Sequence, residues 1–220
     1  NLPEMLEGHY APLMLGAILV PINVRLAPRE IAYILNHSES KLLVFDSEFA
    51  DTVKAVRDQV SSEILFVQVV DKHPQSGSIS SLEYEEFLRS SMSMLEPTEL
   101  DSELATIAIN YTSGTTGQPK GVEYHARGAY LNALGEALQM GMTWRTVYLW
   151  TLPMFHCNGW CYTWGVTAVG GTHVCLRRAD PQEIYHLVDQ ERVNMMCCAP
   201  TILTALYSSP QANKQSLSGL

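Results

Sequence analysis

Apolar residues along this chain alternate between short continuous runs and longer stretches with the helical period of about 3.6 residues. The short runs are rich in β-branched and aromatic residues, which is typical of buried strands. We expect strands at 41–45, 64–70, 105–111, 147–151, 172–176 and 194–198. We expect helices at 2–19, 28–37, 49–60, 82–90, 126–140, 181–192 and 200–208. Strands that alternate with helices predict an α/β fold with a largely parallel sheet.

Three residues indicate where two of these helices begin. Pro28 and Pro181 suit the first helical position, where the missing N–H of proline would have no helical partner. Asp180 stands directly before Pro181 and can accept hydrogen bonds from the first turn as an N-cap. The sequence therefore predicts helix starts at positions 28 and 181.

The composition is that of a folded globular protein. The 220 residues are 46% apolar and 17% charged, with a mean hydropathy near zero. A chain of this length buries roughly 70% of the surface that its unfolded form exposes, which is enough for a sizeable core. We expect Trp144, Trp150 and Trp164 to pack in that core.

The net charge of −9 comes from 23 acidic and 14 basic residues, and it lies almost wholly in the first half of the chain. Residues 1–103 carry 17 acids and 7 bases, whereas residues 104–220 carry 6 and 7. The chain therefore has no basic stripe of the kind that binds nucleic-acid phosphates, and nucleic acid is excluded as a partner. A small anionic ligand fits the second half better.

The first residue, the cysteines and the apolar stretches of the chain indicate where in the cell the protein is expected. The chain begins at Asn1, without Met or a basic leader, and we expect this to be a processing or fragment edge. The apolar stretch 10–24 is interrupted by two prolines and is too short to span a membrane. Five cysteines with no CxxC pair predict reduced thiols in an intracellular protein, cytoplasmic or organellar. His156 beside Cys157 and Cys161 lacks the usual spacing of metal ligands, so we expect no metal there.

A glycine-rich loop follows the strand expected at 105–111. It reads YTSGTTGQPKG over residues 111–121. Gly114 and Gly117 permit positive φ, so that successive backbone N–H groups can surround an anion. Lys120 adds a mobile positive charge, and four hydroxyl groups add donors: Thr112, Ser113, Thr115 and Thr116. The spacing matches neither GxGxxG nor the P-loop, and a flexible surface turn has a similar composition.

A second unusual segment, LPMFHCNGW over residues 152–160, follows the strand expected at 147–151. Ligands of open α/β sheets bind at the carboxyl ends of strands, so this segment and the glycine-rich loop are candidates to line one crevice. His156 can hydrogen-bond an oxygen atom or a thiol, and Gly159 beside Trp160 offers space next to a rigid wall. The alternative is that His156 and Trp160 simply pack in the core.

These two segments carry a resemblance to a known family. YTSGTTGQPKG resembles the signature loop of the adenylate-forming (AMP-binding) superfamily, and LPMFHCNGW resembles the acyl-pocket motif of its short- and medium-chain fatty acyl-CoA synthetases. Residues 16–26 and 199–201 are also similar to that branch. The resemblance implies that residues 1–220 are part of the large amino-terminal domain of such an enzyme, with the small carboxyl-terminal domain absent.

The resemblance implies ATP-dependent activation of a short- or medium-chain carboxylic acid to an acyl-adenylate and then to acyl-CoA. ATP, Mg²⁺ and coenzyme A are the implied cofactors and substrates, and no ligand of Mg²⁺ is expected within this chain. The implied phosphate-binding residues are Thr112, Ser113, Gly114, Thr115, Thr116, Gly117 and Lys120. The implied acyl- and CoA-binding residues are His156, Asn158, Gly159 and Trp160. Lys120 and His156 are the implied catalytic residues.

Two alternatives to this function remain at the level of the sequence. The family's loop for adenine and magnesium, its ribose-binding Gly-Asp pair and its catalytic lysine do not occur in these 220 residues. We therefore expect the isolated chain to be a truncated lobe without catalytic activity. The second alternative is an adenylating enzyme that passes the acyl group to a carrier protein.

Overall fold

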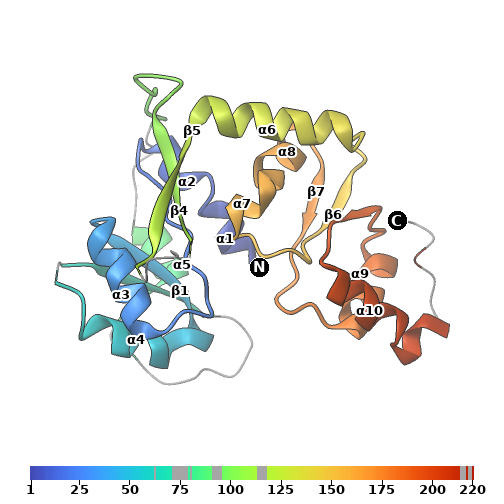
Figure 1. The fold of residues 1–220 in the computed structure, drawn as a ribbon, viewed down its shortest axis with the longest axis horizontal. Coiled ribbons are helices and arrows are strands. Elements are labelled where there is room, and N and C mark those ends of the chain that lie inside the picture. The colour runs from blue at the N-terminus through green and yellow to red at the C-terminus, as the bar shows by residue number, and fades with distance from the viewer. Residues whose placement is uncertain are drawn as a thin grey trace. The chain divides into compact units, whose positions relative to one another are not determined.

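The computed structural model describes residues 1–61, 63–70, 79, 81–90, 96–112, 118–213, 217 and 220 (Figure 1). The chain packs as two compact units, each built from separated segments of the sequence. Unit 1 comprises Asn1–Pro21, Thr98–Asn110 and Glu123–Leu220. Unit 2 comprises Ile22–Pro97 and Tyr111–Val122. Among the described residues, no helix is both long and apolar enough to cross a membrane.

Unit 2 contains a parallel sheet of three strands in the order β1-β2-β3, with the bounds Leu42–Asp46, Leu65–Val69 and Leu82–Glu83. Its helices are α3 (Pro28–His37), the 3₁₀ turn η1 (Ser47–Phe49), α4 (Ala50–Arg57) and α5 (Tyr84–Ser90). Apolar residues of α3 and α4 pack with Phe45 and Phe66 of the sheet to form the core of this unit. Glu30 accepts a hydrogen bond from the Ala27 N–H at 2.8 Å and so closes the first turn of α3.

Unit 1 contains a second parallel sheet, in the order β7-β6-β8, with β6 (Val147–Leu149) between β7 (Thr172–Val174) and β8 (Met195–Met196). Successive side chains of β6 point to opposite faces, as the pleat of a strand requires. Leu149 packs against α9 (Pro181–Gln190) and α10 (Pro200–Tyr207), which the 3₁₀ turn η2 (Pro210–Asn213) follows. Tyr148, together with Trp150 just beyond the strand, belongs to a different core cluster, with Tyr162 of α8 (Tyr162–Ala168).

The helix α6 (Ala126–Gln139) packs closely on α8 through small residues. Ala129, Ala133 and Ala137 recur at the helical i, i+4 spacing and are all buried. A Cβ at Gly165 would lie 3.1 Å from the carbonyl oxygen of Ala133, so a larger residue there would need the two helices to move slightly apart. This contact fixes α8 and with it the segment α7 (Cys157–Trp160), which lies directly before α8.

The strands β4 (Thr106–Thr112) and β5 (Lys120–His125) form a two-stranded sheet, and each contributes residues to both units. In unit 1, the segment that follows α1 (Pro3–Glu7) and α2 (Ala11–Met14) pairs with β4. Leu19 donates its N–H to Ile107 O at 3.0 Å and accepts the Ile109 N–H at 2.8 Å. Leu19 thereby lies parallel to the strand beside Ala108.

The structure confirms the α/β class and the parallel sheets, and each expected strand is present to within a few residues. Pro28 and Pro181 begin helices as expected, and Asp180 accepts hydrogen bonds from the N–H groups of Gln182 at 2.9 Å and Glu183 at 3.2 Å. The helix expected at 2–19 is wrong, because the pairing of Leu19 with β4 ends it early and leaves only α1 and α2.

Two other expectations need correction. The helix expected at 82–90 begins only at Tyr84, because residues 82–83 pair with β2 as β3. Trp144 does not pack in the core: it is 68% exposed, and the Arg145 guanidinium lies over its ring at 4.8 Å. Trp150 is fully buried and Trp164 packs against a core cluster, as expected.

Candidate functional site

The candidate phosphate loop joins β4 to β5 within unit 2. Thr112 is the last residue of β4 and Lys120 the first of β5, and both side chains are exposed. The other candidate phosphate-binding residues, Ser113, Gly114, Thr115, Thr116 and Gly117, lie outside the described residues. The structure therefore places the two ends of the loop on adjacent paired strands, with a hydroxyl on one and an ammonium on the other.

Tyr111, directly before Thr112, is anchored to the end of α3. Its hydroxyl hydrogen-bonds to His37 Nδ1 at 2.7 Å, and the two rings meet edge to face with centroids 5.8 Å apart. His37 in turn stacks on Tyr33, one helical turn earlier, at 5.4 Å. Burial raises the pKa of the Tyr111 hydroxyl, so it stays neutral. His37 was not predicted, since nothing in its local sequence points to a tyrosine 74 residues away.

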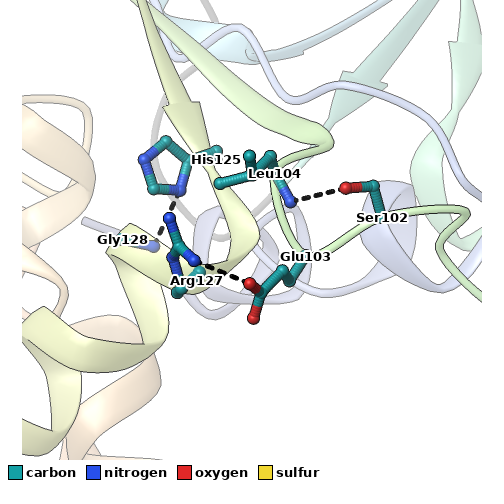
Figure 2. A network of polar contacts seen from close by, with 6 residues as sticks. All are labelled: Ser102, Glu103, Leu104, His125, Arg127 and Gly128. Atoms are coloured by element: carbon teal, nitrogen blue, oxygen red, sulfur yellow. Dashed lines mark hydrogen bonds and ion pairs between the residues drawn. The ribbon is translucent and has the colours of Figure 1, made fainter.

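A polar network in unit 1 fixes the opposite end of the β4–β5 pair (Figure 2). Arg127 at the start of α6 forms an ion pair with Glu103 at 2.7 Å, and Ser102 Oγ accepts the Leu104 N–H at 3.1 Å. His125 caps α6 by accepting the Gly128 N–H on its Nδ1 at 2.9 Å. A side chain at Gly128 would lie 2.9 Å from the His125 ring, so this cap requires glycine.

The LPMFHCNGW segment of unit 1 contains a left-handed turn. Five successive residues have positive φ: Cys157 (51°), Asn158 (52°), Gly159 (59°), Trp160 (58°) and Cys161 (63°). Each L-residue in this region costs about 1–2 kcal/mol relative to the right-handed helix, and only glycine escapes that cost. A run of this kind persists only when surrounding contacts hold it, and such strain is concentrated at functional sites. We refer to residues 157–161 as the left-handed turn.

Buried asparagines hold the left-handed turn against β4. Asn158 Nδ2 donates to Asn110 Oδ1 at 2.9 Å, and Asn110 Nδ2 donates to the Phe155 carbonyl at 3.1 Å. The Asn158 carbonyl accepts from the Cys161 N–H and from Thr163 Oγ1, both at 3.1 Å. Asn158 is fully buried and Asn110 is 7% exposed, so these bonds form away from water.

The indole of Trp150 packs against the left-handed turn at Gly159. A side chain at Gly159 would lie 2.5 Å from Trp150 Cζ3, so the indole fills the space that glycine leaves. The Trp150 Nε1–H donates to His173 Nδ1 at 2.9 Å, which requires that this nitrogen carry no proton. His173 Nε2 then donates to Thr167 Oγ1 at 2.8 Å. Burial lowers the pKa of His173 to about 4, in agreement with a neutral ring.

Asn1 binds the chain that leads into the turn. Its Nδ2 donates to the carbonyls of Trp150 and Leu152, and its Oδ1 accepts the Met154 N–H, each at 2.8 Å. Through these three hydrogen bonds, the Asn1 side chain holds the backbone of residues 150–154 in place. Asn1, Asn110 and His173 were not predicted, because their partners lie far away along the chain.

Two candidate residues at the left-handed turn are exposed to solvent, one just before it and one within it. His156, just before the turn, is exposed, and Trp160 is 53% exposed. The interpretation in which His156 and Trp160 pack in the core is therefore wrong. Asn158 and Gly159 point the opposite way, into the interior. An imidazole in extended backbone and an indole in left-handed backbone are thus both exposed, on either side of the buried Asn158 and Gly159.

The four residues of the second motif, His156, Asn158, Gly159 and Trp160, come together within unit 1, whereas Thr112 and Lys120 belong to unit 2. The part of the chain that the structure describes contains no group of three or more His, Cys, Asp or Glu side chains arranged to hold a metal ion.

Comparison with known proteins identifies the class. The chain matches the sequence profile described as "AMP-binding enzyme" over residues 1–220, and it belongs to that family. Among curated proteins it is 42% identical to 4-hydroxybutyrate–CoA ligase 2 of Metallosphaera sedula, over 99% of this chain and 40% of the relative. It is 37% identical to the peroxisomal acetate/butyrate–CoA ligase AAE7 of Arabidopsis thaliana, over 96% of this chain and 39% of the relative.

Solved structures share the fold. The Mycobacterium tuberculosis fatty acyl CoA synthetase superposes on the whole chain with a TM-score of 0.84 at 24% identity, and 41% of that protein is covered. The amino-terminal domain of FACL13 from the same organism gives a TM-score of 0.80 at 25% identity, over 100% of this chain and 53% of that one. The chain spans about two-fifths of the length of these curated relatives.

Proposed function

We propose that this chain is part of the large amino-terminal domain of an enzyme that activates a short- or medium-chain carboxylic acid with ATP and transfers the acyl group to coenzyme A. Membership of the AMP-binding family and the names of the two curated relatives, which are CoA ligases for small acids, support this. The peroxisomal name of the Arabidopsis relative is consistent with an intracellular, organellar site for the proposed enzyme.

The proposed reaction has two steps. A carboxylate oxygen attacks the α-phosphorus of ATP, the α–β phosphoanhydride bond breaks, and pyrophosphate leaves. The thiol of coenzyme A, after loss of its proton, then attacks the acyl carbon, and AMP leaves with the electrons of the mixed anhydride bond. Neither step needs a covalent bond to the protein, so the work of the chain is to orient two anions and to stabilise charge on phosphate.

At the phosphate loop, exposed hydroxyl and ammonium groups are suited to that work. Thr112 donates to phosphate oxygens, and Lys120 compensates the charge that develops on the leaving pyrophosphate. The residues between them, 113–117, complete the proposed loop. Mg²⁺ would supply further neutralisation of phosphate charge, and the described residues contain no group of three or more His, Cys, Asp or Glu side chains arranged to hold it.

At the left-handed turn, the observation that carries the proposal is the exposure of His156 and Trp160 on a base that is otherwise buried and hydrogen-bonded. An imidazole placed there hydrogen-bonds the acid carboxylate or the incoming thiol, and the indole forms one wall of an acyl pocket. Asn158 and Gly159 serve the site from the interior, where they hold the turn, rather than by touching the acyl chain.

The test uses the protein at the full length of its relatives. We expect pyrophosphate release that depends on a short or medium acid, and acyl-CoA as the product when coenzyme A is present. Release of free adenylate, or transfer to a carrier protein with no acyl-CoA, would contradict transfer to coenzyme A and leave acid activation in place. No acid-dependent pyrophosphate with any such acid would refute acid activation itself. The isolated 220-residue chain is expected to form no acyl-CoA.

A further inference from the structure

Within unit 1, one pair of buried amides joins β4 to the left-handed turn. Asn110 lies on β4, two residues before Thr112, where the candidate phosphate loop begins. Asn158 lies in the left-handed turn, two residues after His156 and two before Trp160. The 2.9 Å bond between their side chains therefore joins the unit 1 part of β4 to the centre of the left-handed turn.

The hydrogen bonds of Asn110 and Asn158 indicate that these side chains do more than fill space in the core. Asn110 uses both ends of its amide, accepting from Asn158 and donating to Phe155, the residue before His156. Asn158 Oδ1 is buried and has no hydrogen-bond partner among the described residues. A buried acceptor without a partner destabilises the fold, so a side chain selected for packing alone would avoid it. We therefore attribute the presence of these two amides to the position in which they hold the turn, and not to a gain in the free energy of folding.

We propose that Asn110 and Asn158 are positioning residues that act as one unit, holding His156 and Trp160 in fixed register with β4. This inference rests on the proposed function. Adenylation requires the carboxylate oxygen to approach the α-phosphorus in line, and a misplacement of about 1 Å costs on the order of 10²-fold in rate. Loss of the amide pair leaves each motif able to bind its own ligand and removes the register between β4 and the turn.

The experiment compares three variants of the protein at the full length of its relatives: Asn110→Ala, Asn158→Gly and the double variant. Glycine at position 158 keeps the left-handed backbone without strain and removes only the amide. We expect each single variant to lower kcat for acid-dependent pyrophosphate release by roughly 10- to 100-fold. We expect the KM for ATP to stay within about threefold of its value in the unsubstituted enzyme, because the loop's own donors remain. We expect the double variant to be no slower than the slower single one, because the residues act as a unit.

Asn194→Ala is the matched control. The Asn194 side chain also bridges distant backbone groups of unit 1, accepting the Val147 N–H at 2.9 Å and donating to the Arg145 carbonyl at 2.8 Å. It touches neither motif, so its loss lowers the melting temperature and leaves kcat unchanged. If Asn158→Gly does not unfold cooperatively, Asn110→Ala alone decides the outcome, since alanine leaves the strand backbone intact.

The possible results separate the positioning role from the proposed function. An active unsubstituted enzyme whose Asn110→Ala and Asn158→Gly variants keep their kcat overturns the positioning role alone. The positioning role is also overturned if the two losses multiply in the double variant, or if Asn194→Ala lowers kcat as much as they do. An unsubstituted enzyme with no acid-dependent pyrophosphate release overturns the proposed function, and the inference with it.

Discussion

Lys120 stands at the first position of β5 with its side chain exposed, and its proposed partner is the phosphate chain of ATP. Replacement by alanine is expected to slow acid-dependent pyrophosphate release by about 10²-fold, because a charged donor to a developing anion is lost. The KM for the acid is expected to stay unchanged. Steady-state kinetics at varied acid and ATP concentrations check this, with Lys54→Ala, an exposed lysine on α4, as the control. Equal rates for the Lys120→Ala variant and the unsubstituted enzyme would speak against the loop assignment.

Trp160 is half exposed, so its truncation is expected to affect ligand binding more than folding. In Trp160→Ala we expect the KM of the longest accepted acids to rise about tenfold, since one wall of the acyl pocket is removed. The free energy of unfolding is expected to change by less than about 0.5 kcal/mol, as for other surface substitutions. Trp144→Ala removes another exposed indole of unit 1 and serves as the control. An unchanged preference for acid length would remove Trp160 from the proposed pocket.

Gly159 is expected to be intolerant of any side chain. In Gly159→Ala the new Cβ lies 2.5 Å from Trp150 at a residue with a φ of 59°, so overpacking and backbone strain add. We expect a loss of roughly 2–5 kcal/mol in the free energy of unfolding. Gly135→Ala is the control: it lies within α6 with nothing within 4 Å of the new Cβ, and should stabilise by about 0.5–1 kcal/mol. Urea unfolding measures both, and equal stability of the two variants would contradict the packing described here.

At the scale of elements, the sequence predicts those parts whose signals are local. The helices α3 and α9 carry their own proline starts and amphipathic spacing, and both appear where expected. The left-handed turn was not predicted, because its backbone depends on Asn110 of β4 and on Trp150 just after β6. The adjacent Asn158 and Gly159 were the available signal, since asparagine and glycine tolerate positive φ best.

Prediction of the candidate site was likewise restricted to signals that are local in the sequence. Residue types and their spacing pointed to Lys120, His156 and Trp160, whose side chains are all exposed. They did not indicate which residues of the second motif would be exposed: Asn158 and Gly159 are buried, whereas His156 and Trp160 are exposed. Burial is a property of packing between distant segments, which a single motif does not contain.

At the scale of the whole molecule, the two units draw on interleaved segments, so neither corresponds to a continuous stretch of sequence. Unit 2 takes Tyr111–Val122 from within the second half of the chain. The composition shows no boundary there, because contacts between distant residues define the units. The acidic first half and the nearly neutral second half of the sequence likewise do not coincide with the two structural units.

Acid is expected to destabilise unit 1 through two histidines, the buried His9 and the partly buried His173. Burial lowers the pKa of His9 and of His173 to about 4 each, from about 6.5 in the unfolded chain. Between pH 6.5 and 4 the unfolded state binds more protons, so stability is full above pH 6.5 and falls as the pH drops towards 4. For His9, which is fully buried, the expected loss at pH 5 is about 2 kcal/mol.

Urea unfolding at pH 7.5 and pH 5 measures this loss. His173→Gln is expected to reduce the difference between the two pH values, because one of the two groups no longer titrates. His186→Gln on α9, where the side chain is exposed, is the control for the loss of a histidine side chain. Equal stability of the unsubstituted chain at the two pH values would show that the two histidines are not held neutral by burial.

The phosphate-loop assignment is tested most directly by ATP binding to this 220-residue chain, measured by calorimetry with Mg²⁺ and a medium-chain fatty acid present. We predict a saturable heat of binding that is lost in Lys120→Ala and kept in Lys54→Ala, with all three chains folded. Binding of equal affinity in Lys120→Ala would contradict the assignment of the loop between β4 and β5 to the phosphates of ATP.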